Sequence, residues 1–302
     1  MKNLRSLFPF RHLLAVRRWF VFIFRPAAYH DGHFYSPAVN PKELKARQQE
    51  LWPAHQSATS SIDWNKQNHQ ALLKSWKSYA KQWPYGLGPE APTSFFEPNG
   101  SFENLDSRVL FAMLRSVKPK RVIEVGGGMS TLLTAETNQT FFGGSIEFTA
   151  IEPYPKDFLE SKVPGLKTLI AKKVQDVPLP VFQDLAAGDI LFIDSSHVAK
   201  TGSDVNYIYL EVLPSLASGV ILHIHDIFLP WEYPVEWVLR ERRNWNEQYL
   251  LQAILTSSTR YKILFASHFA SRVLSDAVSE CWGSQLGGGS MWLQVAPALP
   301  NT

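Results

Sequence analysis

Carboxylate and imidazole side chains stand at the ends of two short apolar runs in the second half of the sequence. Asp194 and His197 follow one run, and His225 and Asp226 end the other. Imidazole titrates near neutral pH and can remove a proton from a substrate, and paired carboxylates can hold a divalent cation such as Mg²⁺. His197, His225 and Asp226 are therefore candidate catalytic residues, and Asp194 and Asp226 are candidate metal ligands.

Each of these residues also has a purely structural interpretation. Asp194 and His197 could cap the helix that follows them, and Asp226 could anchor the loop over residues 227–233. His223 lies deeper on the strand face that carries His225 and is expected to be a buried structural histidine. Two carboxylates and a histidine do not establish a metal site, so metal-dependent and metal-free chemistry both stay open.

A glycine-rich turn at residues 126–128 joins another apolar run to a helical segment that starts near Ser130. Glycine has no side chain, so a nucleoside can lie against such a turn close to the helix N-terminus. The dinucleotide spacing G-x-G-x-x-G is absent, because Thr131 occupies the third glycine position. Glu124 precedes the turn, and its carboxylate would repel a pyrophosphate but attract the sulfonium and ammonium of S-adenosylmethionine.

Glu152 stands at the tip of the next apolar run, between Ile151 and Pro153. A carboxylate at the end of the second strand can accept hydrogen bonds from both ribose hydroxyls of a nucleoside. The alternative is that Glu124 and Glu152 are two unrelated acids at strand ends. Together with the glycine turn, Glu152 favours an adenosine-containing ligand, and the charge of Glu124 favours S-adenosylmethionine over NAD.

The elements that must position these residues follow from residue 121 onward, where apolar runs alternate with helical segments, as in a parallel sheet. The runs cover residues 121–125, 147–151, 166–170, 189–193, 219–225, 261–267 and 290–295. Helices are expected over residues 130–138, 156–161, 203–216 and, in two pieces, 234–257. An irregular stretch joins the last two strands, so these could pair antiparallel. Ligands bind beyond the carboxyl ends of strands in such sheets.

Three segments carry a resemblance to a known family. Glu124–Thr131 resembles methyltransferase motif I in its form E-V-G-x-G-x-S-T. Ile193–His197 and His223–Ile227 resemble the D-x-x-H and H-D-I signatures of bacterial class I methyltransferases, including macrocin-type O-methyltransferases and related uncharacterised members. The resemblance covers about residues 95–296. It implies S-adenosylmethionine as the cofactor and a Rossmann-like α/β fold, with a doubly wound, seven-stranded, mostly parallel sheet whose last strand is antiparallel.

The resemblance also implies an adenine-contacting position after the third strand, which Gln175 and Asp176 occupy, although an exposed loop pair would look the same. The candidate cofactor-binding residues are Glu124, Gly126, Gly127, Gly128, Ser130, Glu152, Gln175, Asp176 and Asp194. O-Methylation of a small-molecule acceptor is the leading hypothesis. Alternatives are another metal-assisted chemistry on the same fold, as in hydroxylase-like relatives, or a catalytically silent cofactor-binding scaffold.

Composition separates a basic leader from the rest of the chain. Residues 1–25 carry six Lys or Arg and no acid, and the remainder is slightly acidic, so the charge does not predict nucleic-acid binding. The leader has no apolar run long enough to span a bilayer. It could lie as a basic aromatic helix on an anionic membrane, or dock on the protein body or on a second subunit of a homo-oligomer.

The expected domains are a leader helix at residues 1–30, a helical extension at 31–95 and a methyltransferase domain at 96–302. Within the extension, Asn40 and Pro41 are expected to open one helix, and a second is expected over residues 66–81. The single cysteine, Cys281, excludes an intramolecular disulfide and a cysteine-cluster zinc site. This composition suits the cytoplasm, with peripheral membrane contact through the leader left open.

Overall fold

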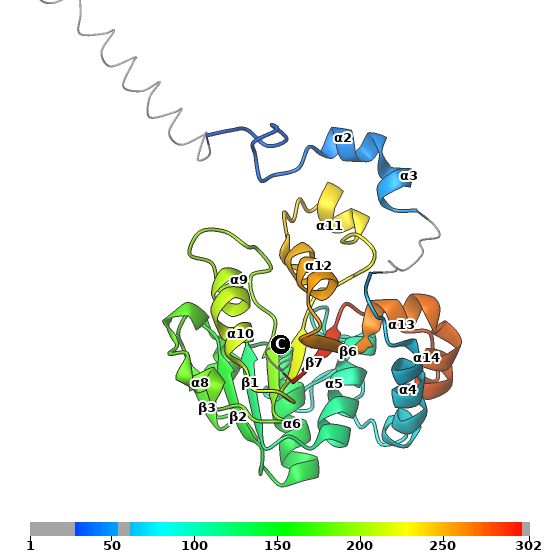
Figure 1. Ribbon diagram of the computed structural model, residues 1–302. Helices are drawn as coiled ribbons and strands as arrows, with labels where there is room; N and C mark the ends of the chain where they lie inside the picture. The colour runs from blue at the N-terminus through cyan, green and yellow to red at the C-terminus, as the bar shows by residue number, and fades with distance from the viewer. Residues whose placement is uncertain (1–27, 54–60, 298–302) are drawn as a thin grey trace, which may run out of the picture. The chain divides into compact units, whose positions relative to one another are not determined.

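The computed structural model describes residues 28–53 and 61–297, and its contacts divide the chain into two units (Figure 1). One unit comprises residues 1–55 and 234–244, and the other comprises residues 56–233 and 245–302. The predicted leader helix falls mostly on residues 1–27, outside the described residues. Among the residues that are described, no helix combines the length and the apolar character needed to cross a membrane.

The smaller unit contains three short helices in its described part. These are α2 (Pro41–Ala46), α3 (Gln48–Leu51) and α11 (Val235–Leu239). The side chain of Asn40 accepts the N–H groups of Lys42 and Glu43, so it caps α2 as predicted. Within this unit α2 contacts α11, and the Val39 N–H donates to the Asn244 side chain at 3.2 Å.

The larger unit is built on a seven-stranded sheet with the order β3-β2-β1-β4-β5-β7-β6. All neighbouring strands are parallel except β7, which runs antiparallel to both β5 and β6. The predicted fold class is therefore confirmed. The strands are β1 (Arg121–Val125), β2 (Glu147–Ile151), β3 (Thr168–Ile170), β4 (Ile190–Ile193), β5 (Ile221–Ile224), β6 (Tyr261–Ala266) and β7 (Met291–Val295).

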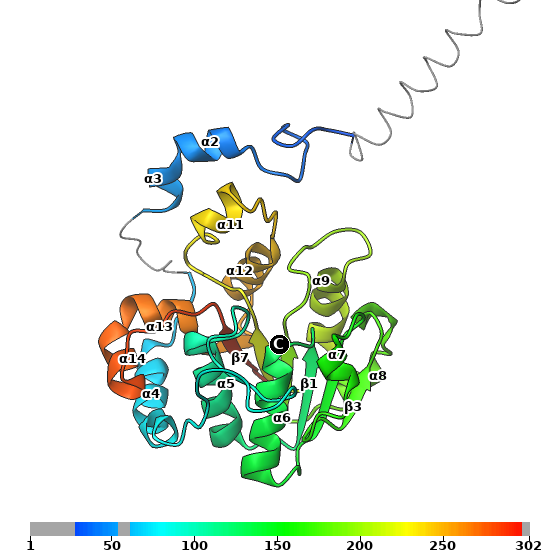
Figure 2. The same ribbon diagram turned by 180° about the vertical axis from the view of Figure 1, so that it is seen from behind.

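Helices lie on both faces of this sheet (Figures 1 and 2, seen from opposite sides). They are α4 (Lys66–Ala80), α5 (Asn104–Val117), α6 (Met129–Phe142), α7 (Asp157–Glu160), α8 (Pro180–Gln183), α9 (Asp204–Tyr207), α10 (Leu213–Ser215), α12 (Glu247–Ser257), α13 (Ser267–Val273) and α14 (Ser275–Trp282). The helix predicted over residues 203–216 is divided, because a π-helical segment, η2 (Ile208–Val212), separates α9 from α10. Pro214 follows that segment and has no N–H for the carbonyl four residues earlier, which favours the change of helix type.

Alternate residues of each strand enter two separate hydrophobic cores. Val122, Phe192 and Ile221 pack with α4, α5, α6 and α14 in one core. Ile123 and Leu222 face the other way and pack with η2, α10 and α12 in the second core. Burial on both faces explains why the strands read as continuous apolar runs and not as alternating patterns. The cores hold the sheet rigid, so the strand ends have fixed positions.

Candidate functional site

The carboxyl ends of four neighbouring strands carry most of the candidate residues. The N–H group just beyond each strand continues the parallel ladder: Gly126 donates to Ile151, Asp194 to Val125 and His225 to Ile193, at 2.8–2.9 Å. Glu152 donates in the same way to β3. The register of the sheet therefore brings the glycine turn, Glu152 and the catalytic candidates to one edge, as predicted.

The glycine turn is shaped by close contact with β4. Gly126 has φ +91°, and a Cβ atom there would lie 1.7 Å from the carbonyl oxygen of Asp194. A Cβ on Gly127 would lie 2.9 Å from Leu159 and 3.1 Å from Glu152, whereas one on Gly128 would meet nothing within 4 Å. Gly126 is therefore required by the fold, a side chain on Gly127 would need Leu159 and Glu152 to shift, and Gly128 leaves open space beside the N-terminus of α6.

A cavity of about 500 Å³ adjoins this turn. Gly126, Glu152, Gln175 and Asp194 line it, and Asp176 is not part of its lining. The carboxylate of Glu152 accepts the N–H groups of Gly127 at 3.0 Å and of Tyr154 at 2.8 Å, which fixes its direction. The cavity has room for a nucleoside-sized ligand, since small-molecule pockets begin at about 300 Å³.

Glu124 is buried on β1 beside the N-terminus of α6. Its Oε1 accepts the hydroxyl of Ser130 at 2.5 Å, and its Oε2 has no ordinary hydrogen bond to any described residue. Burial raises the pKa of Glu124 to about 8, against the opposing effects of Ser130 and Thr131.

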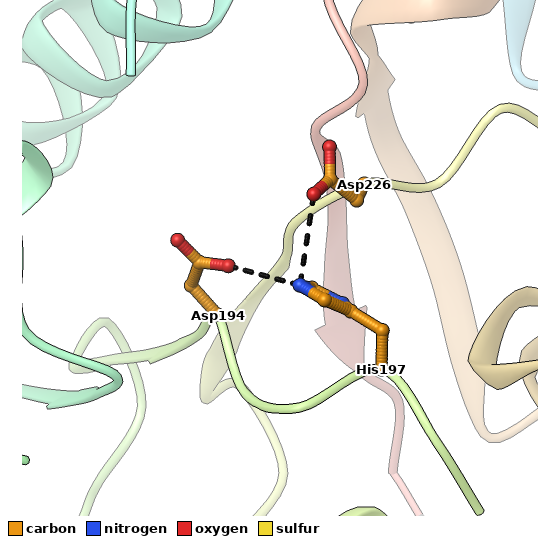
Figure 3. A group of neighbouring side chains, drawn as sticks. All are labelled: Asp194, His197 and Asp226. Atoms are coloured by element: carbon orange, nitrogen blue, oxygen red, sulfur yellow. Dashed lines mark ion pairs between the residues drawn. The ribbon is translucent and has the colours of Figure 1, made fainter. Parts of the chain in front are cut away.

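Asp194, His197 and Asp226 converge at the ends of β4 and β5 (Figure 3). His197 Nε2 lies 3.2 Å from Asp194 Oδ1 and 3.6 Å from Asp226 Oδ2. One donor atom from each residue fits within a span of 4.8 Å. The capping interpretation of Asp194 and His197 is wrong, because Ser203 caps the following helix, α9, by accepting the N–H of Asn206.

The cluster is strongly charged. Burial opposes the charge on His197, but the carboxylates of Asp194 and Glu247 outweigh it and raise the histidine's pKa to about 10. Burial likewise opposes ionisation of Asp194, but His225 and His197 lower its pKa. Burial raises the pKa of Asp226. Three carboxyl groups thus lie around one imidazole, and their oxygens are ligands that divalent cations accept.

His225 and His223 belong to one buried polar chain with Ser290. His223 Nε2 lies 2.9 Å from the Ser290 hydroxyl, which is 3.5 Å from His225 Nδ1. Burial lowers the pKa of His223 well below the usual range, so this histidine is neutral and structural, as predicted. His225 Nε2 lies 3.7 Å from Asp226 Oδ1, so this ring reaches the charged cluster.

Two buried acids beside the site were not predicted. Glu247 Oε2 lies 2.9 Å from His197 Nδ1, although the two residues are 50 positions apart. Asp106 accepts the N–H groups of Gly289 and Ser290 at 2.7 and 2.9 Å. Both acids lie in the first turn of a helix, where carboxylates are common for local reasons, so the sequence carried no distinguishing signal.

The strand order, the glycine turn and the acids at the strand ends define the class I methyltransferase fold. A family model described as a methyltransferase domain matches residues 123–227. An uncharacterised protein of Archaeoglobus fulgidus is 35% identical over 159 residues, which cover 51% of this chain and 72% of that protein. The chain therefore carries a methyltransferase domain over residues 123–227.

Solved structures that resemble this chain in fold, at low sequence identity, include the following two methyltransferases. The S-adenosylhomocysteine-bound methyltransferase of Podospora anserina is 13% identical, with a TM-score of 0.39 over 85% of this chain and 95% of that chain. The O-methyltransferase of Bacillus cereus in complex with S-adenosylhomocysteine is 11% identical, with a TM-score of 0.37 over 84% and 100%.

We expect the glycines of the turn to differ in their tolerance of a side chain. Gly126→Ala should lower the free energy of unfolding by at least about 2 kcal/mol, because it combines a positive φ with a backbone clash. Gly128→Ala should cost about 1 kcal/mol or less, as expected at a helix N-cap with open space. Urea denaturation measures both values, and equal losses would contradict the described turn.

Proposed function

We propose that the protein transfers a methyl group from S-adenosylmethionine to an oxygen atom of a small-molecule acceptor, with a divalent cation at the Asp194–His197–Asp226 cluster. One observation carries the proposal. Asp194 lines the cavity that the glycine turn and Glu152 form, and it is also a member of the charged cluster. A cofactor in that cavity would therefore place its methionine end next to the residues that handle the acceptor.

The residues of the cavity fit S-adenosylmethionine. Glu152 is held at its edge with oxygen lone pairs to spare for two ribose hydroxyls. Gln175 Oε1 is buried without an ordinary hydrogen-bond partner among the described residues, so it could accept the adenine amino group. The free Oε2 of Glu124 suits a cationic ligand. The bound cofactor would supply an electrophilic methyl group on sulfonium, which needs orientation more than activation.

The cluster also fits a divalent cation. Two carboxylates and one imidazole, with donor atoms within 4.8 Å, are ligands that suit Mn²⁺, Fe²⁺ or Zn²⁺ as well as Mg²⁺. A cation held there would polarise an acceptor hydroxyl and lower its pKa. Asp194 and Asp226 would orient an acceptor with two adjacent hydroxyls, such as a sugar diol or a catechol. The acceptor class is therefore proposed to be a small vicinal diol.

His225 is the proposed general base. His197 has both ring nitrogens engaged with carboxylates, whereas His225 Nε2 has a longer contact, 3.7 Å, with Asp226. The ring of Phe102 lies 5.1 Å from the His225 ring and supports it on one side. His225 would accept the proton of the acceptor hydroxyl as the methyl group moves, and Asp226 would stabilise the resulting imidazolium.

Cofactor affinity tests the proposed role of Glu152. Glu152→Ala should weaken S-adenosylmethionine binding by about 1.5–3 kcal/mol, which is the loss of hydrogen bonds to a charged acceptor. Isothermal titration calorimetry measures the change. Glu147→Ala is the matched control, because Glu147 lies at the opposite end of β2 in an exposed ion pair with Lys167. This variant should bind S-adenosylmethionine with wild-type affinity. Equal affinities of the wild type and Glu152→Ala would remove Glu152 from the cofactor site.

The pH dependence of cofactor binding tests Glu124. With a pKa of about 8, Glu124 is protonated in the free protein below that pH, and a cationic ligand must displace the proton. Affinity for S-adenosylmethionine should therefore rise as the pH is raised from 6 to 7.5, by up to about tenfold per pH unit. Glu124→Gln should flatten this profile, and an unchanged slope in that variant would assign the proton to another group.

Methyl transfer tests the cluster. Asp226→Asn should lower turnover by about 10²-fold or more while leaving cofactor affinity unchanged, because it disturbs the base and the cation site together. A chelator should lower wild-type turnover to a similar level. The assay follows S-adenosylhomocysteine formed with a panel of small diols and catechols. Asp184→Asn, at an exposed position before β4, should behave as wild type. Normal turnover in Asp226→Asn would place the chemistry elsewhere.

A further inference from the structure

Glu247 is a buried acid that the fold alone does not explain. It is the first residue of α12, its side chain is fully buried, and its carboxylate accepts a hydrogen bond from His197. Burial raises its pKa, against the effect of His197. The Tyr209 hydroxyl also attracts it, without the geometry of an ordinary hydrogen bond. A buried carboxylate is costly unless it is paired, and an apolar residue would fill the same space at lower cost.

The start of α12 holds His197 by its backbone as well as by its ring. The N–H groups of Asn246 and Glu247 both donate to the His197 carbonyl, at 3.0 and 3.2 Å. The Asn246 side chain exchanges two hydrogen bonds with the backbone of Ala199, at 2.6 and 3.3 Å. The Trp245 ring lies 4.3 Å from the imidazole. His197 has φ +60°, and these contacts hold that uncommon conformation in place.

The contact with Glu247 determines how the imidazole is used. Nδ1 donates a hydrogen bond to Glu247 Oε2 at 2.9 Å, so Nδ1 is the ring nitrogen that keeps its proton. The other nitrogen, Nε2, lies between Asp194 and Asp226 (Figure 3), where its lone pair would be available to a cation that replaces the Nε2 proton. A carboxylate that accepts the far N–H of a ligating histidine fixes the ring and makes it a better ligand.

We infer that Glu247 is the positioning residue of this site, which directs Nε2 of His197 toward a divalent cation shared with Asp194 and Asp226. The inference rests on the cation site of the proposed function. Glu247 itself would not touch the cation or the acceptor. Its effect would pass through His197, so its loss should alter cation affinity and turnover without altering the cofactor cavity, whose lining it does not enter.

The test uses the full chain and Mn²⁺ as the probe. Glu247→Gln keeps the shape of the side chain but removes its charge, and calorimetry should show Mn²⁺ affinity reduced about 10–100-fold, with unchanged S-adenosylmethionine affinity. Asp189→Asn is the matched control, because Asp189 is equally buried but binds only backbone N–H groups at the opposite end of the sheet. Wild-type Mn²⁺ affinity in Glu247→Gln would overturn the inference.

A spectroscopic measurement separates this inference from the proposed function. In protein labelled with ¹⁵N-histidine, the Nδ1–H signal of His197 should be slow to exchange in the wild type, with and without Zn²⁺, and fast to exchange in Glu247→Gln. An unprotonated Nδ1 in the Zn²⁺-loaded wild type would refute the role of Glu247, even if that variant does not fold. If the wild type binds no cation, the proposed cation site fails and the inference fails with it. A normal Nδ1–H signal would then show only a structural contact.

Discussion

Parallel hydrogen bonding among β3, β2, β1, β4 and β5 fixes the geometry on which the site depends. Each strand stops at nearly the same level, and the next residue still donates its N–H to the neighbouring strand. Residues on different strands, such as Glu152 and Asp194, are thereby placed along one edge by the backbone alone. The positions of these residues also depend on the two hydrophobic cores, because packing on both faces of the sheet holds the strands in place.

The same edge concentrates groups that are costly to bury. Glu124, Glu247 and Asp226 all have pKa values raised by burial, and His197 is held among carboxylates. Residues with strongly shifted pKa values are found at functional sites more often than elsewhere, because burying an ionisable group destabilises the fold. Glu124 lies on β1 beside the N-terminus of α6, whereas Asp226 and Glu247 lie around the His197 imidazole.

Much of this arrangement follows from the sequence, because it depends on local signals. The apolar runs, the glycine turn and the acids after each run predict the sheet and its active edge, and the structure confirms the strand positions to within a few residues. Contacts between distant segments could not be predicted in this way. Glu247 reads as an ordinary acid in the first turn of a helix, and only the packing of α12 against the loop after β4 brings it to His197. The π-helical segment before Pro214 likewise has no sequence pattern that distinguishes it from an α-helix.

The place of β7 has a consequence for the order in which the site can form. β7 follows β6 in the chain but lies between β5 and β6, so neither of those strands pairs with the other. The segment just before β7 also accepts the N–H of Ile227, through Gly289, and donates to Asp106. Gln248 can anchor the loop after Asp226 earlier, through the N–H of Phe228, but the contact of Ile227 with Gly289 requires residues about sixty positions further on. A nascent chain that ends before β7 would contain the glycine turn and its acids but would lack this contact beside Asp226.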